Sequence, residues 1–414
     1  MRFKNILITE SGNKFISIIH HINNKKFFEK IKLRDWSAII LAGGQGKRLL
    51  PLTSLIPKPL VKVTNKAMVD YSIAHLMYAN IKHIILALAY MGKELRSYIE
   101  KTWTADKLGD VELECVIQES KGTADAYRLI SERIDSENIV VSMADIVTNL
   151  PMASFMDFHI EKGGTTTISM KTSESHTSQY GVVLLDNNRK IYLFLEKPAP
   201  MELYLSSMAQ RTDLFLHTNI INTGIYCFKK EIDQILQETG LMDFGGEVFP
   251  YLLENSYDLY GFVQNYYWLD CGNAQTYLWA NWDLLRKYSW PITPNGDEYD
   301  GIYVMGIINS GQNATIEKPT CFGENVELLN RAIIKPLTSI GNRVKVGEDT
   351  IIEKSVIWDD VNIGAGCRID ESIICNNCDI GDNVVLHNAI VAPNSRISND
   401  TQIRDKTLDL GTDI

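Results

Sequence analysis

The 414-residue sequence predicts an α/β domain with a Rossmann-like, mixed but mostly parallel sheet, followed by a left-handed parallel β-helix. Three observations lead to this fold class. Apolar runs alternate with helical stretches up to about residue 288, which is typical of a layered α/β domain. Aliphatic residues then recur at fixed spacing between residues 340 and 403, as in a solenoid of hexapeptide repeats. A connector containing proline and asparagine, residues 290–296, separates the two patterns.

The α/β domain is expected to span residues 36–290. Residues 37–42 form a continuous apolar run, which predicts a buried parallel strand that enters a glycine cluster. The other strands are expected at 83–89, 111–117, 138–143 and 166–170, and two of the helices at 69–79 and 93–100. Residues 1–35 form an N-terminal extension with a predicted short hairpin and helix. No function is assigned to this extension.

The repeat predicts the second domain in detail. Twelve aliphatic residues follow one another at spacings of 6, 6 and 5, so that a 17-residue unit recurs: Ile340, Val346, Ile352, Ile357, Ile363, Ile369, Ile374, Ile380, Leu386, Val391, Ile397 and Ile403. One aliphatic side chain should point inward from each face of a triangular prism. We place a linker at 291–313, the β-helix at 314–405 with a less regular first part, and a tail at 406–414.

Composition narrows the function class. The net charge of −10 and the lack of a strongly basic stretch argue against nucleic-acid binding. No apolar run is long enough to span a bilayer, and the N-terminus lacks a signal-peptide core. Seven cysteines, an odd number in a long chain, favour a reduced cytoplasmic setting. The lone pair Cys375 and Cys378 has no partner pair for zinc, and is expected to be part of the repeat.

The sharpest motif follows the first strand. It reads LAGGQGKRLLPLT over residues 41–53, with Pro57-Lys58-Pro59 close behind. Glycines let the backbone approach an anion closely, and Arg48 and Lys58 add two cations. Arg48 stands where a Walker A loop needs Ser or Thr, and the glycines are not spaced as in a dinucleotide fingerprint. The motif therefore suits a triphosphate that is bound neither by a Walker A loop nor by a dinucleotide-binding loop.

This motif resembles the signature of the nucleoside-diphosphate-sugar pyrophosphorylases, the sugar-1-phosphate nucleotidyltransferases. The resemblance runs from about residue 37 to the end of the chain, because many members carry a C-terminal hexapeptide β-helix. It implies a glycosyltransferase-A type sheet. It also implies a reaction in which a hexose 1-phosphate attacks a nucleoside triphosphate, with Mg²⁺ as cofactor and pyrophosphate as leaving group. Arg48 and Lys58 would be the catalytic cations.

The resemblance also implies the binding residues. Those expected to hold the nucleotide are Leu41, Ala42, Gly43, Gly44, Gly46, Gln118, Gly122 and Thr123. Those expected to hold the sugar phosphate are Gly181, Glu196, Lys197, Asn222 and Thr223. Asp145 and Asp270 would bind the metal. Ala144 departs from the family, which usually has glycine before the first aspartate.

Substrate choice stays open. Residues 61–70 lack the longer glycine- and arginine-containing segment of bacterial ADP-glucose enzymes, whereas the run Gly122-Thr123-Ala124 is one that those enzymes favour. Mannose-1-phosphate guanylyltransferases are the nearest in appearance, with adenylyl- or thymidylyltransferase activity on glucose 1-phosphate as the alternative. A non-catalytic scaffold subunit would tend to lose the charged residues, which are all present. An acyltransferase β-helix would need a catalytic histidine, for which the prism offers His387 alone. The β-helix is expected to form homo-oligomer contacts, with no membrane or nucleic-acid partner.

Overall fold

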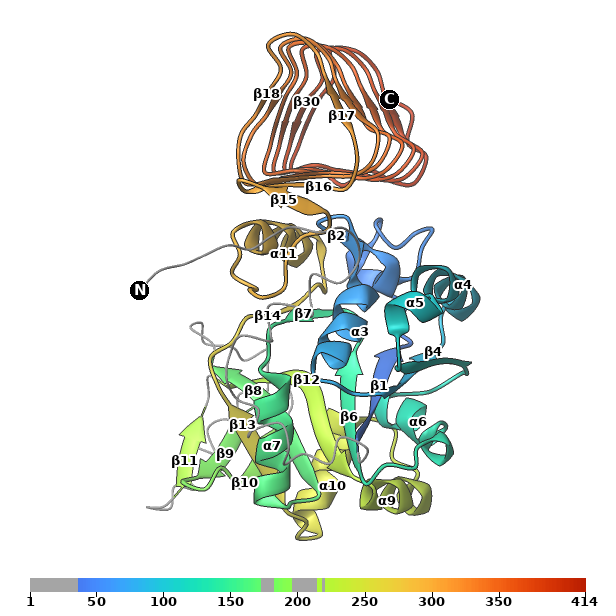
Figure 1. Ribbon diagram of the computed structural model, residues 1–414, viewed down its shortest axis with the longest axis vertical. Coiled ribbons are helices and arrows are strands. Elements are labelled where there is room, and N and C mark those ends of the chain that lie inside the picture. Colours follow the sequence, from blue (N-terminus) through green and yellow to red (C-terminus); the bar gives the residue numbers. More distant parts are fainter. Residues whose placement is uncertain (1–35, 173–181, 196–213, 218–219) are drawn as a thin grey trace.

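The computed structural model describes residues 36–172, 182–195, 214–217 and 220–414. It consists of two domains stacked along the long axis of the molecule, with the prism above the α/β domain in Figure 1. Helix α11 (Ala274–Leu285) and the hairpin of β2 (Lys62–Val63) and β3 (Lys66–Ala67) lie at the junction of the two domains.

A seven-stranded sheet forms the centre of the α/β domain. Its order is β13 (Leu259–Val263), β8 (Thr166–Thr172), β12 (Ile220–Lys229), β6 (Asn138–Met143), β1 (Trp36–Ala42), β4 (His83–Leu88) and β5 (Glu112–Ile117). Only β12 is antiparallel to its neighbours β6 and β8, while the other described pairings in this sheet are parallel. The sheet is therefore mixed and mostly parallel, as predicted.

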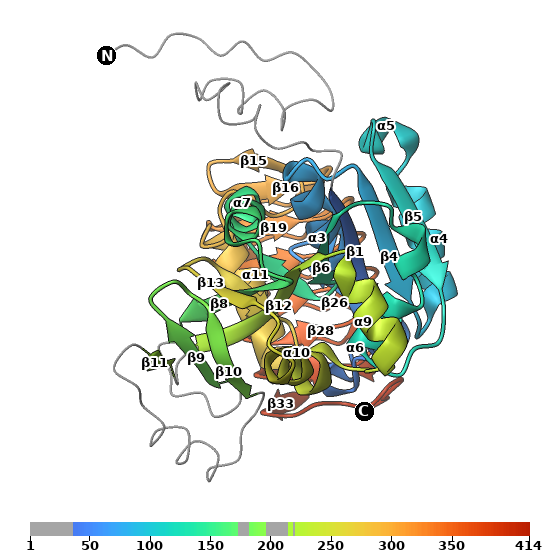
Figure 2. The same ribbon diagram turned by 90° about the horizontal axis from the view of Figure 1, so that it is seen from below.

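Helices cover both faces of this sheet (Figure 2). Ala38 and Ile40 of β1 pack with α3 (Met68–Tyr78), α4 (Gly92–Thr102) and α7 (Met152–Lys162). Ile39 and Leu41 pack on the other side with α6 (Thr123–Arg128), α9 (Glu231–Thr239) and α10 (Phe249–Glu254). Because side chains alternate along a strand, a strand covered on both faces must be apolar throughout. None of the helices in the described ranges is both long and apolar enough to cross a membrane.

Smaller elements complete the domain. They are the three-stranded sheet of β10 (Ile191–Leu195), β9 (Val182–Asp186) and β11 (Leu214–His217), the pair β7 (Ile146–Thr148) and β14 (Trp268–Asp270), and α5 (Ala105–Leu108). Short 3-10 turns cover Lys47–Leu49, Lys58–Leu60 and Ser131–Arg133, and one π turn covers Phe244–Val248. From residue 36 on, the strands and helices predicted from the sequence agree with the observed ones to within two residues at each end. The hairpin and helix expected within residues 1–35 lie outside the described residues.

The second domain is a three-sided parallel β-helix. Its first face holds β15 (Asp297–Tyr299), β16 (Ile302–Val304), β19 (Thr320–Phe322), β22 (Thr338–Ile340), β25 (Val356–Ile357), β28 (Ile373–Ile374) and β31 (Ile390–Val391). The second holds β17 (Ile308–Ser310), β20 (Val326–Leu328), β23 (Lys345–Val346), β26 (Asn362–Ile363), β29 (Asp379–Ile380) and β32 (Arg396–Ile397). The third holds β18 (Thr315–Ile316), β21 (Ile333–Ile334), β24 (Ile351–Glu353), β27 (Arg368–Asp370), β30 (Val385–His387) and β33 (Gln402–Arg404).

The interior of the prism confirms the predicted repeat. All twelve aliphatic residues of the 6, 6, 5 pattern are buried in one cluster. Glycines follow where neighbouring coils approach closely: a Cβ on Gly347 would lie 2.3 Å from the Gly364 carbonyl carbon. His387 lies on the third face, 3.1 Å from Asp370. This contact makes it part of a ladder between coils.

The prism begins earlier, ends later and is more regular than expected. Strands β16 and β17 lie inside the expected linker 291–313, yet they stack in parallel register on β19 and β20. The expected tail continues the coil, since Thr407 and Asp413 bridge to Ile390 and Arg396. The early coils differ only in length: Phe322 to Ile340 spans 18 residues rather than 17, and both side chains are buried. One extra residue at a corner leaves the stack intact.

The first face of the prism packs on the α/β domain. One buried cluster contains prism side chains such as Tyr303, Cys321 and Trp358 together with Tyr277 and Leu278 of α11. All seven cysteines are free. Cys375 faces this junction and Cys378 faces the prism core. Both cysteines are thus packed in the wall of the repeat, as expected.

Candidate active site

The site lies where parallel strands end. β1 and β6 are neighbours with Leu41 opposite Met143, so the residues that follow them emerge at the same edge of the sheet. The Ala144 N–H donates to the Leu41 carbonyl at 3.0 Å, and Leu41 and Ala42 are buried. This pairing brings the glycine loop after β1 next to Asp145 after β6.

Gly46 closes the glycine loop in a conformation that favours glycine. Its φ is +64°, and a Cβ there would lie 2.9 Å from the Thr53 Cγ2 and 3.1 Å from the Lys58 Cβ. Thr53 Oγ1 also donates to the Gly46 carbonyl at 2.9 Å. The loop is thus packed against the segment that carries Lys58. By contrast, a Cβ on Gly44 would meet nothing within 4 Å, so open space lies above the loop.

Lys58 occupies the centre of the charged residues. It begins a 3-10 turn after Pro57, and only 7% of its surface is exposed. Its Nζ forms an ion pair with Asp145 Oδ2 and a second one, of 3.3 Å, with Asp270 Oδ1. Burial opposes the charge, but the two carboxylates outweigh burial and raise the pKa of Lys58. The ammonium is therefore charged at neutral pH.

Asp270 reaches the site from a distant part of the chain. It ends β14 opposite Ile146 of β7, and the next N–H, of Cys271, donates to the Asp145 carbonyl at 3.4 Å. Burial raises the pKa of Asp270, and the nearby Asp145 raises it further, while Lys58 and Arg48 lower it. One ammonium neutralises only one of the two carboxylate charges. Asp145 and Asp270 therefore still attract a further cation.

The donor set fits Mg²⁺. Within the described ranges, no cluster of three or more His, Cys, Asp or Glu side chains is arranged to hold a metal ion. Mg²⁺ needs no such cluster, because it is usually bound through one or two carboxylates, water and substrate phosphates. Asp145 and Asp270 have side chains that are 30% and 39% exposed, which leaves oxygen atoms accessible from the open side.

Arg48 is the second cation of the motif. It is exposed on the 3-10 turn Lys47–Leu49, and the neighbouring Leu49 is buried. In the described part of the chain no hydrogen bond or ion pair holds its guanidinium, although its charge lowers the pKa of Asp270. Arg48 is thus close to the carboxylates and available to an anion.

The segment 118–123 lies beside the glycine loop, because a Cβ on Gly43 would lie 3.9 Å from Ser120 Oγ. Gln118 Nε2 donates to the Ala126 carbonyl at 2.8 Å, which orients the amide oxygen away from that carbonyl.

Gly122 and Thr123 have a structural task that the sequence did not reveal. A Cβ on Gly122 would lie 2.2 Å from the Met242 carbonyl oxygen. Thr123 Oγ1 donates to Asp243 at 3.0 Å and accepts from the Phe244 N–H at 3.0 Å. Both residues therefore hold α6 against the loop 242–244, which leaves the Thr123 hydroxyl engaged within the protein rather than available to a nucleotide.

The residues expected to hold the sugar phosphate are only partly described. Gly181, Glu196 and Lys197 lie outside the described residues. Asn222 and Thr223 lie at an irregularity of β12, and a Cβ on the following Gly224 would lie 3.3 Å from Ile146 and 3.4 Å from Met143. The irregularity thus lies alongside the strand ends that flank Asp145.

Thr223 has its hydroxyl engaged within the protein. Its side chain is fully buried, and Oγ1 donates to the Ser169 carbonyl at 2.9 Å and lies 3.0 Å from the Tyr266 hydroxyl. The Trp268 indole N–H donates to the Thr223 carbonyl at 2.8 Å. The Thr223 hydroxyl is therefore engaged within the protein, and the role expected for Thr223 in holding the sugar phosphate stays a prediction. The sequence did not identify Ser169 and Tyr266 as partners of Thr223, because a serine within an apolar strand is only a weak sign of a buried polar contact.

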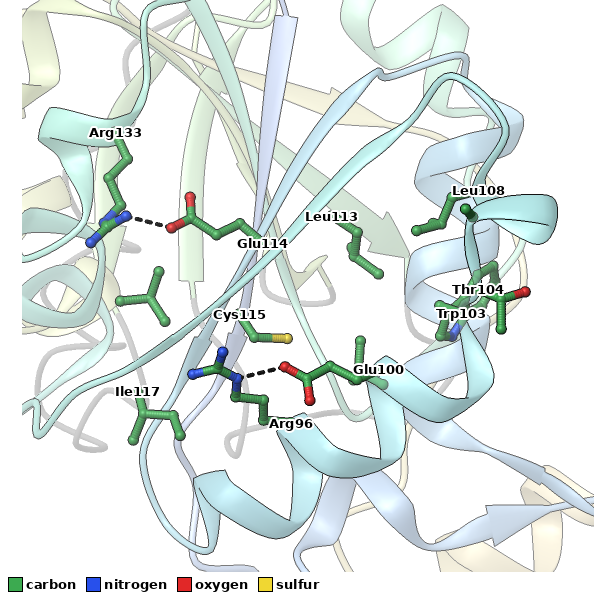
Figure 3. A pocket seen from close by; sticks show the side chains of 13 residues that line it. Arg96, Glu100, Trp103, Thr104, Leu108, Leu113, Glu114, Cys115, Ile117 and Arg133 are labelled. Atoms are coloured by element: carbon green, nitrogen blue, oxygen red, sulfur yellow. Dashed lines mark hydrogen bonds and ion pairs between the residues drawn. The ribbon is translucent and has the colours of Figure 1, made fainter.

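A cavity of about 710 Å³ lies elsewhere, at the outer edge of the sheet (Figure 3). It is lined by residues of α4, α5 and β5 and by Arg133, and two ion pairs, Arg96 with Glu100 along α4 and Arg133 with Glu114, lie in its wall. None of the residues predicted for the site lines it.

A glycine loop, two cations and two carboxylates at one sheet edge are the elements of a phosphoryl- or nucleotidyl-transfer site. Comparison with known proteins decides between them. A model of the nucleotidyl transferase family matches residues 37–287, and a model of the EIF2B subunit epsilon LbH domain matches residues 300–403. The chain belongs to the nucleotidyl transferase family and carries a left-handed β-helix after its catalytic domain, as predicted.

Similar curated proteins are sugar-1-phosphate nucleotidyltransferases. UTP–glucose-1-phosphate uridylyltransferase of Synechocystis sp. is 27% identical over 78% of this chain and 82% of its own. Glucose-1-phosphate adenylyltransferase of Trichlorobacter lovleyi is 26% identical over 79% and 91%. Mannose-1-phosphate guanylyltransferase catalytic subunit beta of Drosophila pseudoobscura pseudoobscura is 30% identical over 67% and 70%.

Proposed function

We propose that this nucleotidyltransferase joins a hexose 1-phosphate to a nucleoside triphosphate and releases pyrophosphate, with Mg²⁺ as cofactor. The observation that carries the proposal is the position of Lys58, which contacts both Asp145 and Asp270 next to the glycine loop. A cation and two metal-binding carboxylates within contact of one another are what transfer at an α-phosphate needs.

The chain contributes placement and charge. The open loop at Gly44 would receive the triphosphate, and Arg48 and Lys58 would neutralise charge that builds up on the α-phosphate and the departing pyrophosphate. Mg²⁺, when bound to Asp145 and Asp270, supplies further neutralisation of the phosphates. A phosphate oxygen of the sugar 1-phosphate is itself the nucleophile, so the protein needs to hold the two substrates in line rather than to form a covalent intermediate.

We assign GTP and mannose 1-phosphate as the substrate pair. Two guanylyltransferases, from Arabidopsis thaliana and Drosophila pseudoobscura pseudoobscura, are 29% and 30% identical to this chain, and residues 61–70 lack the longer arginine-containing segment of adenylyltransferases. Glucose 1-phosphate with another nucleotide is the second candidate, which the run Gly122-Thr123-Ala124 and relatives at 26–27% identity favour.

Pyrophosphate release tests both levels of the proposal. The full chain with Mg²⁺ is mixed with each of ATP, GTP, UTP and dTTP and with mannose 1-phosphate or glucose 1-phosphate. We expect release with GTP and mannose 1-phosphate to exceed that of every other pair. Preference for a glucose pair would overturn the substrate assignment alone. The absence of pyrophosphate release with every pair would contradict the enzyme proposal and favour a scaffold role.

We also propose a homo-oligomer built through the β-helix. The first face is covered by the α/β domain, so the second and third faces and the end of the prism are the surfaces that a second copy would use. Light scattering coupled to gel filtration should give a mass that is a multiple of the 46.8 kDa chain. A monomer at micromolar concentration would contradict this proposal.

A further inference from the structure

The hairpin after Lys58 connects the active site to the β-helix. Its tip, Thr64 and Asn65, has positive φ at both residues and enters the junction between the domains. There Asn65 Nδ2 donates to the Ile340 carbonyl of the prism at 2.7 Å. The Thr64 N–H donates to Asn281 of α11 at 2.8 Å. Only three residues separate Lys58 from β2, so the hairpin and the catalytic lysine share one short segment.

A second connection runs through buried side chains. The Trp358 indole N–H of the prism donates to the Tyr277 hydroxyl at 2.9 Å, and that hydroxyl donates to the Lys62 carbonyl at 2.6 Å. Tyr277 is fully buried and Trp358 nearly so. The direction of each bond is fixed, because an indole N–H can only donate and a carbonyl can only accept. Lys62 Nζ is also bound to Asp359 of the prism at 2.6 Å.

The apolar packing continues behind the other charged residues. The buried cluster that contains Tyr277 and Trp358 also contains Leu49, next to Arg48, and Cys271, next to Asp270. Every charged group of the site thus lies within three residues of a side chain that is packed in the same cluster as the first prism face, Asp145 through Val147.

We infer that the β-helix positions Lys58, with Trp358 and Tyr277 as positioning residues that hold the Lys62 backbone. This inference rests on the proposed role of Lys58. The prism then acts as a rigid support for the catalytic cation, in addition to any role in assembly. Because tight placement of a catalytic group matters strongly for rate, loosening the Lys62 carbonyl should slow the reaction without abolishing folding.

The junction offers a matched control. Trp282 of α11 also donates its indole N–H across the same interface, to the Lys354 carbonyl at 3.1 Å, but the hydrogen bond does not lead to the hairpin. Trp358→Phe and Trp282→Phe each remove one such bond. Tyr277→Phe removes the hydroxyl between Trp358 and Lys62 and keeps the ring.

The experiment compares pyrophosphate release from GTP and mannose 1-phosphate at saturating Mg²⁺ with the thermal midpoints of the same proteins. We expect Tyr277→Phe and Trp358→Phe to lower kcat about tenfold, with KM values within about twofold of the parent. Trp282→Phe should lower the thermal midpoint similarly and leave kcat unchanged. In a Lys58→Met background, Tyr277→Phe should add no further loss, because the residue it positions is gone.

The outcomes separate the inference from the proposed function. If Lys58→Met keeps the parent rate, the role of Lys58 is wrong and the proposed function fails. If Lys58→Met loses activity but Tyr277→Phe and Trp358→Phe behave like Trp282→Phe, only the inference is overturned. A full additional loss in the double variant would also overturn it, since Tyr277 would then act independently of Lys58.

Discussion

The two domains place their important residues in different ways. In the β-helix, each coil contacts the equivalent positions of the next, 17 or 18 residues along the chain, as Arg343 does with Asp360 and Arg331 with Asp349. In the α/β domain, Lys58 contacts residues 87 and 212 positions away. The prism is thus built from repeated neighbour contacts, and the site from a few long-range ones.

This difference predicts whether a substitution in each domain should mainly change stability or mainly change activity. A solenoid distributes stability over similar interfaces, so damage to one coil should affect folding rather than chemistry. A site assembled from distant segments depends on single groups, so one change should affect chemistry rather than folding. The junction around Tyr277 is where the two kinds of construction meet.

The largest effect should come from Asp270→Asn. The change keeps the shape of the side chain but removes one of two carboxylates proposed to bind the metal, so we expect a rate loss on the order of 10²–10³-fold. Pyrophosphate release measures the loss, and circular dichroism should show an intact fold. Full activity in this variant would mean that the metal assignment is wrong.

The opposite pattern should follow from Ile369→Ala in the prism core. Ile369 is almost fully buried, and truncating such a side chain typically costs about 2–5 kcal/mol of stability. Urea unfolding of the β-helix should shift accordingly, while kcat at 25 °C stays at the parent value. A loss of kcat comparable to that of Asp270→Asn would contradict the view that the prism governs stability and the α/β domain governs activity.

The α/β domain should also respond to pH through His159. This residue is fully buried on α7, with Nδ1 2.8 Å from Thr167 Oγ1, and burial lowers its pKa to about 4. The unfolded chain therefore binds a proton between pH 6.5 and 4 that the folded chain does not. Stability is complete above pH 6.5 and falls toward pH 4, by up to about 3 kcal/mol.

The control for this titration is His159→Asn, which retains a hydrogen-bonding group near Thr167 and cannot take up the proton. Chemical unfolding of both proteins from pH 7 to pH 4 makes the comparison. The variant should lose less stability than the parent as the pH falls. Parallel curves for the two proteins would show that another group is responsible.

The smallest effect concerns metal affinity in the absence of nucleotide. Because Lys58 pairs with both carboxylates, its ammonium and a divalent cation compete for them. Lys58→Met should bind Mn²⁺ about tenfold more tightly than the parent, as measured by calorimetry. Unchanged or weaker binding would mean that the carboxylate pair does not hold the ion by itself.

Much of this could be predicted from the sequence, for physical reasons that can be named. The prism core followed from the 6, 6, 5 spacing, because inward positions recur with the coil. Asp145 was predicted from the family resemblance, and its meeting with the glycine loop follows from chain direction, because parallel strands end at one edge of a sheet. Both are consequences of local periodicity and chain direction.

The remainder depends on partners that no local pattern reveals. The hydroxyls of Thr123 and Thr223 are engaged by Asp243 and by Ser169, which are remote in the chain. The start of the prism was placed too late because its first coils have 18 residues, which breaks the 17-residue spacing. The hairpin at Thr64 and Asn65 carries a turn signal, but its insertion into the junction depends on both domains at once.

The seven cysteines allow the unfolding of the molecule to be followed region by region. Cys115 is partly exposed, and burial raises the pKa of its thiol to about 11. The other six are buried: Cys227 in the α/β domain, Cys271, Cys321 and Cys375 in the cluster at the junction, and Cys367 and Cys378 inside the prism. A thiol-specific label applied during gradual denaturation would therefore record the sequence of events by which the parts come apart, without any engineered probe.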